Sequence, residues 1–215
     1  MLITLKSHFT IWRRSFYLAC ILYGVSWLFG IMISAKFAPQ SVLHNLQITP
    51  VMTYSAWGYI SHNVGVEVLL LLGACTFGIG TGLVLCLNGV FDGIIVTAIA
   101  RHYGLGVLLA GLLPHGLFEA SAWILISTYG FLLSGRFKRI ISSLWNNSNR
   151  DTSENAANRS LETPAETKSA RSSNKISEVY FALIITSTLL LVLAGTIEAY
   201  ISPMLVRLLI SSVKG

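Results

Sequence analysis

Long apolar runs separated by short polar breaks dominate the chain. The runs Phe16–Ala35 and Val179–Tyr200 each contain about 20 residues, enough for a helix to cross a hydrocarbon core of ~30 Å at 1.5 Å per residue. Two more runs of this kind are Val64–Leu87 and Gly116–Gly135. The pattern therefore predicts an all-α membrane protein.

The segment between the runs Val64–Leu87 and Gly116–Gly135 is interrupted by polar residues. Val90–Ala100 is apolar, Arg101–Gly104 interrupts it, and Leu105–Leu113 is apolar again before Pro114. The pattern predicts either one span with a polar kink or a re-entrant pair of half-helices, since irregular backbone at membrane depth must be covered by protein or line a water-filled cavity. We expect Pro114 to start the next helix in its first turn.

Basic residues predict which side of the membrane each end faces. Lys6, Arg13 and Arg14 precede the first run, and the cluster Arg136–Arg139 follows the run that ends at Gly135. Cytoplasmic segments carry an excess of Lys and Arg, so an even number of crossings should separate the two clusters. The broken segment must then cross as well. We expect a polytopic helical bundle of about five spans in the cell membrane, with the C-terminus outside.

These features divide the chain into five parts. They are a cytoplasmic interfacial segment (1–15), a membrane core of four spans (16–135), a cytoplasmic loop (136–178), a last transmembrane helix (179–200) and a short tail (201–215). The middle of the loop, Asn146–Lys175, is rich in Asn, Ser, Thr and mixed charge. Because it has too few apolar residues to fold alone, we expect it to be disordered.

Composition narrows the class of protein further. Hydrophobic residues make up 53% of the chain and charged residues 11%, against about 25% charged in soluble domains. The net charge of +6 comes from basic residues that flank apolar runs, a pattern that does not favour nucleic-acid binding. Cys20, Cys75 and Cys86 lie in apolar runs without a CxxC pair, so we expect neither a disulfide framework nor a zinc site.

Charged residues inside the apolar runs are the candidate functional groups. Glu67, Asp92, Glu119, Glu198 and Arg101 lie at or near membrane depth, where a charge costs about 2.5–3.5 kcal/mol on insertion scales. Such groups either have a partner and a function or lie near helix ends and extend into water. Both interpretations are open at this stage.

Two polar pairs have helical spacing. Asn63 and Glu67 are four residues apart, as are His115 and Glu119, so each pair shares a helix face. Without a third ligand at defined spacing this is weak evidence for a metal, and we expect no metal and no cofactor. A structural polar cluster between helices, or proton handling by His115, fits better. The residues of this predicted intramembrane cluster are Asn63, Glu67, Asn88, His115, Glu119 and Glu198.

Glycines four residues apart predict close helix packing. Gly78 and Gly82 form one such pair, and Gly89 and Gly93 form another. Gly78, Gly80 and Gly82 do not form a nucleotide-binding loop. Such a loop needs its third glycine at a different spacing, a strand before it and an amphipathic helix after it. Asn88-Gly89 and Asp92-Gly93 are typical of a polar turn. No nucleophile elbow or phosphate loop occurs in the sequence, and we do not expect an enzyme.

The order of the polar landmarks resembles a known family. His62-Asn63, a glycine-rich span, Asn88-Gly89 with Gly93, and Leu113-Pro114-His115-Gly116 with Glu119 are similar to the stage II sporulation protein M family of bacterial and archaeal membrane proteins. The similarity extends from about Ser61 to Gly135. The last span, which ends Glu198–Pro203, is similar to the end of the sporulation members.

The resemblance implies two alternative roles. Sporulation members are membrane scaffolds that hold two peptidoglycan-degrading proteins, the D and P proteins, while the septal wall is thinned during engulfment. Other members accompany ABC-type transporters or act in the production of, or immunity to, circular bacteriocins. The expected partners are therefore the lipid bilayer and either wall hydrolases or an ABC transporter. A homo-oligomer is a further possible assembly, and we do not expect a nucleic-acid partner.

The charge pattern makes a topological prediction. Phosphatase and fluorescent-protein fusions placed after Gly135 and after Gly215 should report opposite sides of the membrane, because one crossing separates these points. Reporters on the same side would eliminate the five-span arrangement.

Overall fold

The computed structural model describes residues 2–37, 55–151 and 166–214 of the chain. Every regular element in these ranges is a helix. The elements are α1 (Leu2–Phe37), α3 (Ala56–Leu72), the 3-10 helix η1 (Gly73–Thr76), α4 (Ile79–Asp151) and α5 (Glu166–Lys214). The expectation of an all-α membrane bundle is confirmed.

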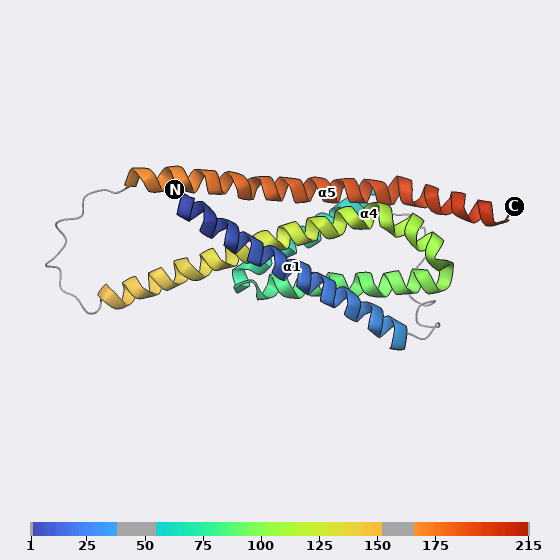
Figure 1. Ribbon diagram of the computed structural model, residues 1–215, viewed down its shortest axis with the longest axis horizontal. Coiled ribbons are helices and arrows are strands. Elements are labelled where there is room, and N and C mark those ends of the chain that lie inside the picture. The colour runs from blue at the N-terminus through green and yellow to red at the C-terminus, as the bar shows by residue number, and fades with distance from the viewer. Residues whose placement is uncertain (1, 38–54, 152–165, 215) are drawn as a thin grey trace.

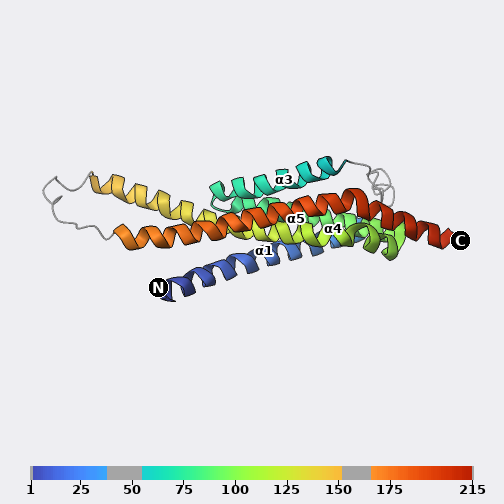
Figure 2. The same cartoon turned by 90° about the horizontal axis from the view of Figure 1, so that it is seen from above.

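The helices run roughly along one long axis. Figure 1 shows α5 beside the return limb of α4, and Figure 2 shows α1 and α3 on opposite sides of the layer that α4 and α5 form. α4 contacts all the other helices, and α5 packs on both α3 and α4. α4 is therefore the centre of the bundle.

A tight turn joins α3 to α4 where we expected a continuous helix. α3 ends at Leu72, η1 follows, and Phe77 (φ 55°) and Gly78 (φ 86°) have left-handed backbone before α4 begins at Ile79. A Cβ on Gly73 would overlap the backbone of Thr81, so glycine lets the two helix ends meet. The single span Val64–Leu87 was therefore a wrong prediction, because the residues of this turn are small or apolar and leave the apolar run unbroken.

A second reversal lies inside α4. Gly104 has φ 83° and ψ 168°, conformations that a helix does not contain, and Figure 1 shows the chain folding back there. The two limbs pack on each other: a Cβ on Gly82 would meet Phe131 at 3.9 Å, and Ile99 clusters with Val107.

This reversal corrects the interpretation of the broken segment. The chain turns at Gly104, and Val90–Leu113 is not one crossing with a kink. Asn88-Gly89 and Asp92-Gly93 lie within α4 and are not a turn, and Pro114 lies inside α4 and does not begin a helix. A proline is tolerated within a membrane helix because neighbouring helices and side chains satisfy the freed backbone groups.

Four helical segments are long and apolar enough to cross a membrane. They are Thr10–Lys36, Ala56–Thr76, Ile79–Trp145 and Phe181–Leu209. The third has 67 residues, roughly 100 Å if it were straight, and it folds back at Gly104. The third and fourth predicted crossings are thus two limbs of one helical element, with boundaries that differ from those expected.

The polar loop contains more helix than expected. α4 continues to Asp151 and α5 begins at Glu166, so most of the segment 136–178 is helical, including the two ends of the stretch predicted to be disordered. Residues 152–165 lie outside the described residues. Adding a residue to an existing helix is much cheaper than starting one. α5 also passes Pro203 and runs to Lys214, where we expected the last helix to end at residue 200 and a short tail to follow.

α1 lies against α4 at very short range. A Cβ on Gly30 would overlap the backbone of Val90, and a Cβ on Gly93 would overlap the backbone of Trp27. At the far end of α1, the Arg101 guanidinium donates to the carbonyl oxygens of Ser34 (3.3 Å) and Ala35 (2.8 Å). A cation at a helix C-terminus also complements the helix dipole.

The α1–α4 contact predicts opposite effects for two glycines. Gly93→Ala should lower stability by about 1–3 kcal/mol, because the helices must separate to admit the methyl group. Gly24→Ala is the matched control: it lies in α1 with nothing within 4 Å of the added Cβ, so its stability should be unchanged or higher. Thermal unfolding in one detergent measures both, and equal effects would contradict this packing.

Candidate functional site

A buried carboxyl joins α3 to α5. Glu67 is 3% exposed, and its carboxyl accepts hydrogen bonds from Ser187 Oγ and from Thr188 Oγ1, the latter 3.0 Å from Oε2 and 3.2 Å from Oε1. Both hydroxyls also lie 2.9 Å from the carbonyl oxygen of Ile184. The Glu67 carboxyl therefore takes its partners from a different helix, which ties α3 to α5.

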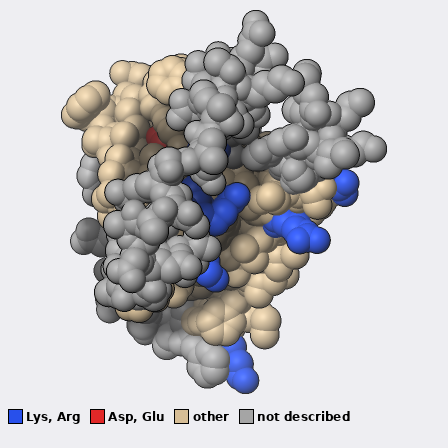
Figure 3. Space-filling model, turned by 90° about the vertical axis from the view of Figure 1, so that its left-hand side faces the viewer, with Lys and Arg blue, Asp and Glu red and all other residues tan. Residues whose placement is uncertain are grey.

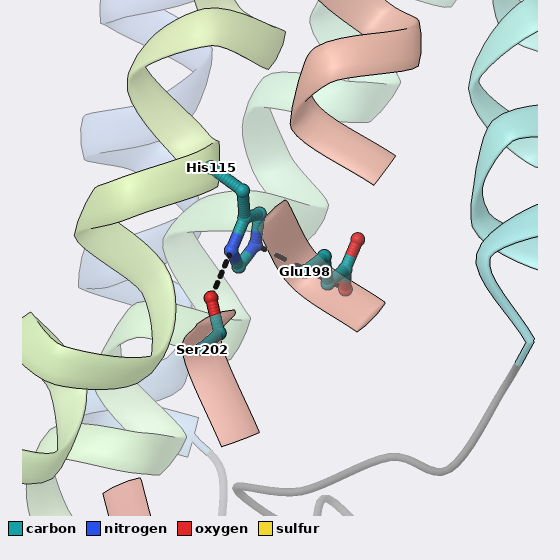
Figure 4. Close-up of polar contacts among 3 residues, drawn as sticks. All are labelled: His115, Glu198 and Ser202. Carbon is teal, nitrogen blue, oxygen red and sulfur yellow. Dashed lines mark hydrogen bonds and ion pairs between the residues drawn. The ribbon is translucent and has the colours of Figure 1, made fainter. Parts of the chain in front are cut away.

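A second polar contact joins α4 to α5. Figure 4 shows the His115 ring between Ser202 and Glu198. His115 Nδ1 lies 3.1 Å from Ser202 Oγ, with the donor set by the ring tautomer, and His115 Nε2 lies 3.9 Å from Glu198 Oε1. The latter contact is an ion pair when the imidazole is protonated. Both partners are on α5, one turn apart.

A third polar contact joins α1 to α4. The Tyr23 hydroxyl donates to Asp92 Oδ2 at 2.6 Å, and the Tyr23 ring stands edge-on to Trp123, with centroids 6.4 Å apart. Glu119 lies one turn before Trp123 on α4. Among the described residues no hydrogen bond to the Glu119 carboxyl is found.

The predicted polar cluster is thus divided into separate contacts. Asn88 Nδ2 donates within its own helix, to the carbonyl oxygen of Val84 at 2.8 Å. Asn63 is 2% exposed, and its Nδ2 has no partner among the described residues. Glu67 and His115 bind different parts of α5. The helical spacing that we used places residues on a face, but it does not show which helix lies opposite.

Sequence reasoning missed the partners of these groups. They are three hydroxyl residues and one phenol: Tyr23 lies in the first apolar run, Ser187 and Thr188 lie in the last one, and Ser202 lies just after it. A signal was available, because Ser and Thr in membrane helices often hydrogen-bond across helices. Their pairing with particular acids required the positions of the two turns.

The predicted packing glycines have different surroundings. Gly89 and Gly93 lie against α1, where a Cβ on Gly89 would overlap Ser26. Gly82 has ordinary contacts with Leu22 and Phe131 at 3.8–3.9 Å. Gly78 has positive φ in the α3–α4 turn, so Gly78 and Gly82 are not a pair on one helix face.

The arrangement is suited to holding helices together. In the part of the chain that the structure describes, no group of three His, Cys, Asp or Glu residues could hold a metal ion. The polar groups instead bridge α1 to α4, α3 to α5 and α4 to α5. His115, between a hydroxyl and a carboxyl, has the chemistry to pass a proton as well.

Comparison with known proteins identifies the family. The family model described as stage II sporulation protein M matches residues 17–203. The chain belongs to this family. The match runs from α1 to α5 and includes all three polar contacts, which confirms the resemblance seen in the sequence motifs.

The chain is also similar to another protein over about half of its length. An uncharacterized protein of Methanocaldococcus jannaschii is 27% identical over 115 residues, which are 53% of this chain and 65% of that protein. The chain thus matches just under two thirds of the length of that relative. No solved structure matches the chain.

The Glu67 contact predicts that stability depends on the hydroxyls of Ser187 and Thr188. The double change Ser187→Ala with Thr188→Val should lower stability by about 1–3 kcal/mol, because it leaves a buried carboxyl without donors. Thr196→Val is the control on the same helix, since Thr196 is exposed and, among the described residues, its hydroxyl bonds only to the carbonyl oxygen of Val192. Unfolding in mixed micelles gives both values, and similar losses would show that the cross-helix bonds add nothing.

Proposed function

We propose that this protein is a membrane scaffold that recruits peptidoglycan hydrolases during septal wall thinning and engulfment. The observation that carries the proposal is that the buried polar groups join helices to one another. Glu67 of α3 and His115 of α4 both have their hydrogen-bond partners on α5. Such contacts hold helices in fixed positions. Family membership supports the same role, since sporulation members are expected to be scaffolds of this kind.

The charge distribution supports an orientation for the scaffold. Exposed Arg13 and Arg14 on α1, with Lys138 and Arg139 on α4, belong to the end where α1 begins and α4 leaves the bundle. Figure 3 views the molecule from this end and shows several Lys and Arg side chains on it. We assign this end to the cytoplasm. The opposite end, with the turn at Gly104, then faces the cell wall.

The partner test is co-purification from the native host in a mild detergent. The scaffold proposal predicts that peptidoglycan hydrolases come with the protein, and that Leu105→Glu reduces their recovery. Leu105 is 69% exposed beside the Gly104 turn, at the end assigned to the wall. Deletion of residues 152–165 is the control at the cytoplasmic end and should leave recovery unchanged. Recovery of an ABC-type ATPase in place of hydrolases would contradict the proposal.

One observation favours the second candidate, an accessory of a transporter or of a bacteriocin export or immunity system. His115 Nε2 lies 3.9 Å from Glu198 Oε1, and Glu119 follows His115 by four residues on the same face of α4. A row of Asp, Glu and His side chains at membrane depth is typical of proton relays. A transporter needs these groups to change protonation, whereas a scaffold needs only their contacts.

Glu119→Gln separates the two candidates. The amide keeps nearly the same size and hydrogen-bonding capacity but cannot titrate. The scaffold proposal predicts wild-type protein level and function for Glu119→Gln, because no hydrogen-bond partner of Glu119 among the described residues is lost. Function is measured at matched expression, for example as completed engulfment. An abundant but inactive Glu119→Gln protein would support the transport role.

A further inference from the structure

A groove outside the polar contacts lies where α4 leaves the bundle. Its volume is about 470 Å³, and its lining residues are Phe77, Lys138, Ile141, Ser142 and Trp145. The last four are at positions i, i+3, i+4 and i+7 of α4, so they form one face of the helix. Phe77 is 54% exposed and Trp145 is 69% exposed. The volume is in the range of sites that hold small molecules.

The groove lies at the boundary between the apolar core and the polar end of the molecule. A Cβ on Gly78 would meet Ser134 Oγ at 3.0 Å, so the α3–α4 turn is level with the end of the apolar run in α4. Lys138 is one turn further along, and Trp145 nearly two turns beyond that. Tryptophan is enriched at membrane–water interfaces. The groove therefore begins at the hydrocarbon edge and continues through the headgroup region.

The charge of this region is positive. Lys138 has no acidic partner among the residues whose side chains the structure describes, and Arg136 and Arg139 are its neighbours on α4. Arg13 and Arg14 of α1 belong to the same end, and Figure 3 shows Lys and Arg side chains on this face. A ligand of this groove must therefore combine an apolar part with a negative charge.

We propose that the groove binds one anionic phospholipid. Its acyl chain packs on Phe77, Ile141 and Trp145, and its phosphate contacts the ammonium group of Lys138. Charge complementarity selects an anionic lipid, because a zwitterionic headgroup has no net charge to compensate Lys138. Position selects a lipid over a soluble anion, because the apolar walls of the groove lie at the membrane surface. This site is independent of whether the protein recruits hydrolases.

The test uses Trp145 as an internal probe. The full chain is reconstituted in phosphatidylcholine nanodiscs that contain either brominated phosphatidylglycerol or brominated phosphatidylcholine, and the Trp145 signal is the difference between wild type and Trp145→Phe. Half-quenching should occur at a mole fraction of brominated phosphatidylglycerol about five-fold lower than for brominated phosphatidylcholine, the preference that one basic group near an anionic lipid provides. Equal half-quenching by the two lipids would overturn the proposal.

Three variants distinguish a site from general attraction. Lys138→Gln should abolish the preference, whereas Arg139→Gln, its neighbour outside the groove lining, should retain it. Ser142→Phe keeps every charge but fills the groove, and it should also abolish the preference. Equal losses in Lys138→Gln and Arg139→Gln, or a preference that survives Ser142→Phe, would overturn the site. Absence of quenching by either lipid would mean that protein covers the groove, and would also overturn it.

Discussion

A carboxyl group inside a membrane has no water to bind, and this constraint organises the bundle. Glu67 is almost fully buried on α3, and its hydrogen-bond donors are the hydroxyls of Ser187 and Thr188 on α5. His115 makes the corresponding contact from α4 with Ser202. Hydrophobic burial supplies little net attraction between helices in lipid, so packing and polar contacts of this kind must hold them together.

Close packing of glycine supplies the other part of the assembly. α1 makes its contact with α4 through Gly30 and Gly93, positions where even a methyl group would overlap backbone. This approach brings Tyr23 of α1 within hydrogen-bonding distance of Asp92 on α4. Arg101 then binds the carbonyl end of α1. The polar contacts and the glycine contacts thus depend on the same helix positions.

The sequence was sufficient for the class of fold but not for the positions of the turns. Hydropathy identifies apolar runs reliably, because each must be long enough to cross the hydrocarbon core. It does not detect the turn at Phe77 and Gly78, since the residues there are small or apolar and leave the run unbroken. The sequence pattern also misplaced Pro114. Proline often begins a helix in soluble proteins, but Pro114 lies inside α4.

The same limit explains the candidate site. Glu67 and His115 were recognisable as costly residues in lipid, but their partners Ser187 and Ser202 are more than 80 residues further along the chain. Pairing them requires knowing that α5 lies against both α3 and α4, which only the two reversals determine. Asn88 shows the opposite case, because its amide is satisfied within its own helix and needs no neighbour.

The central claim is that cross-helix hydrogen bonds to Glu67 hold α5 in place. A double-mutant cycle measures this directly: unfolding free energies of the wild type, Glu67→Leu, the Ser187→Ala/Thr188→Val protein, and the combination of all three changes, in one micelle system. The structure predicts a coupling energy of about 1 kcal/mol or more between the carboxyl and the two hydroxyls. Additive effects, with a coupling energy of zero, would contradict the account.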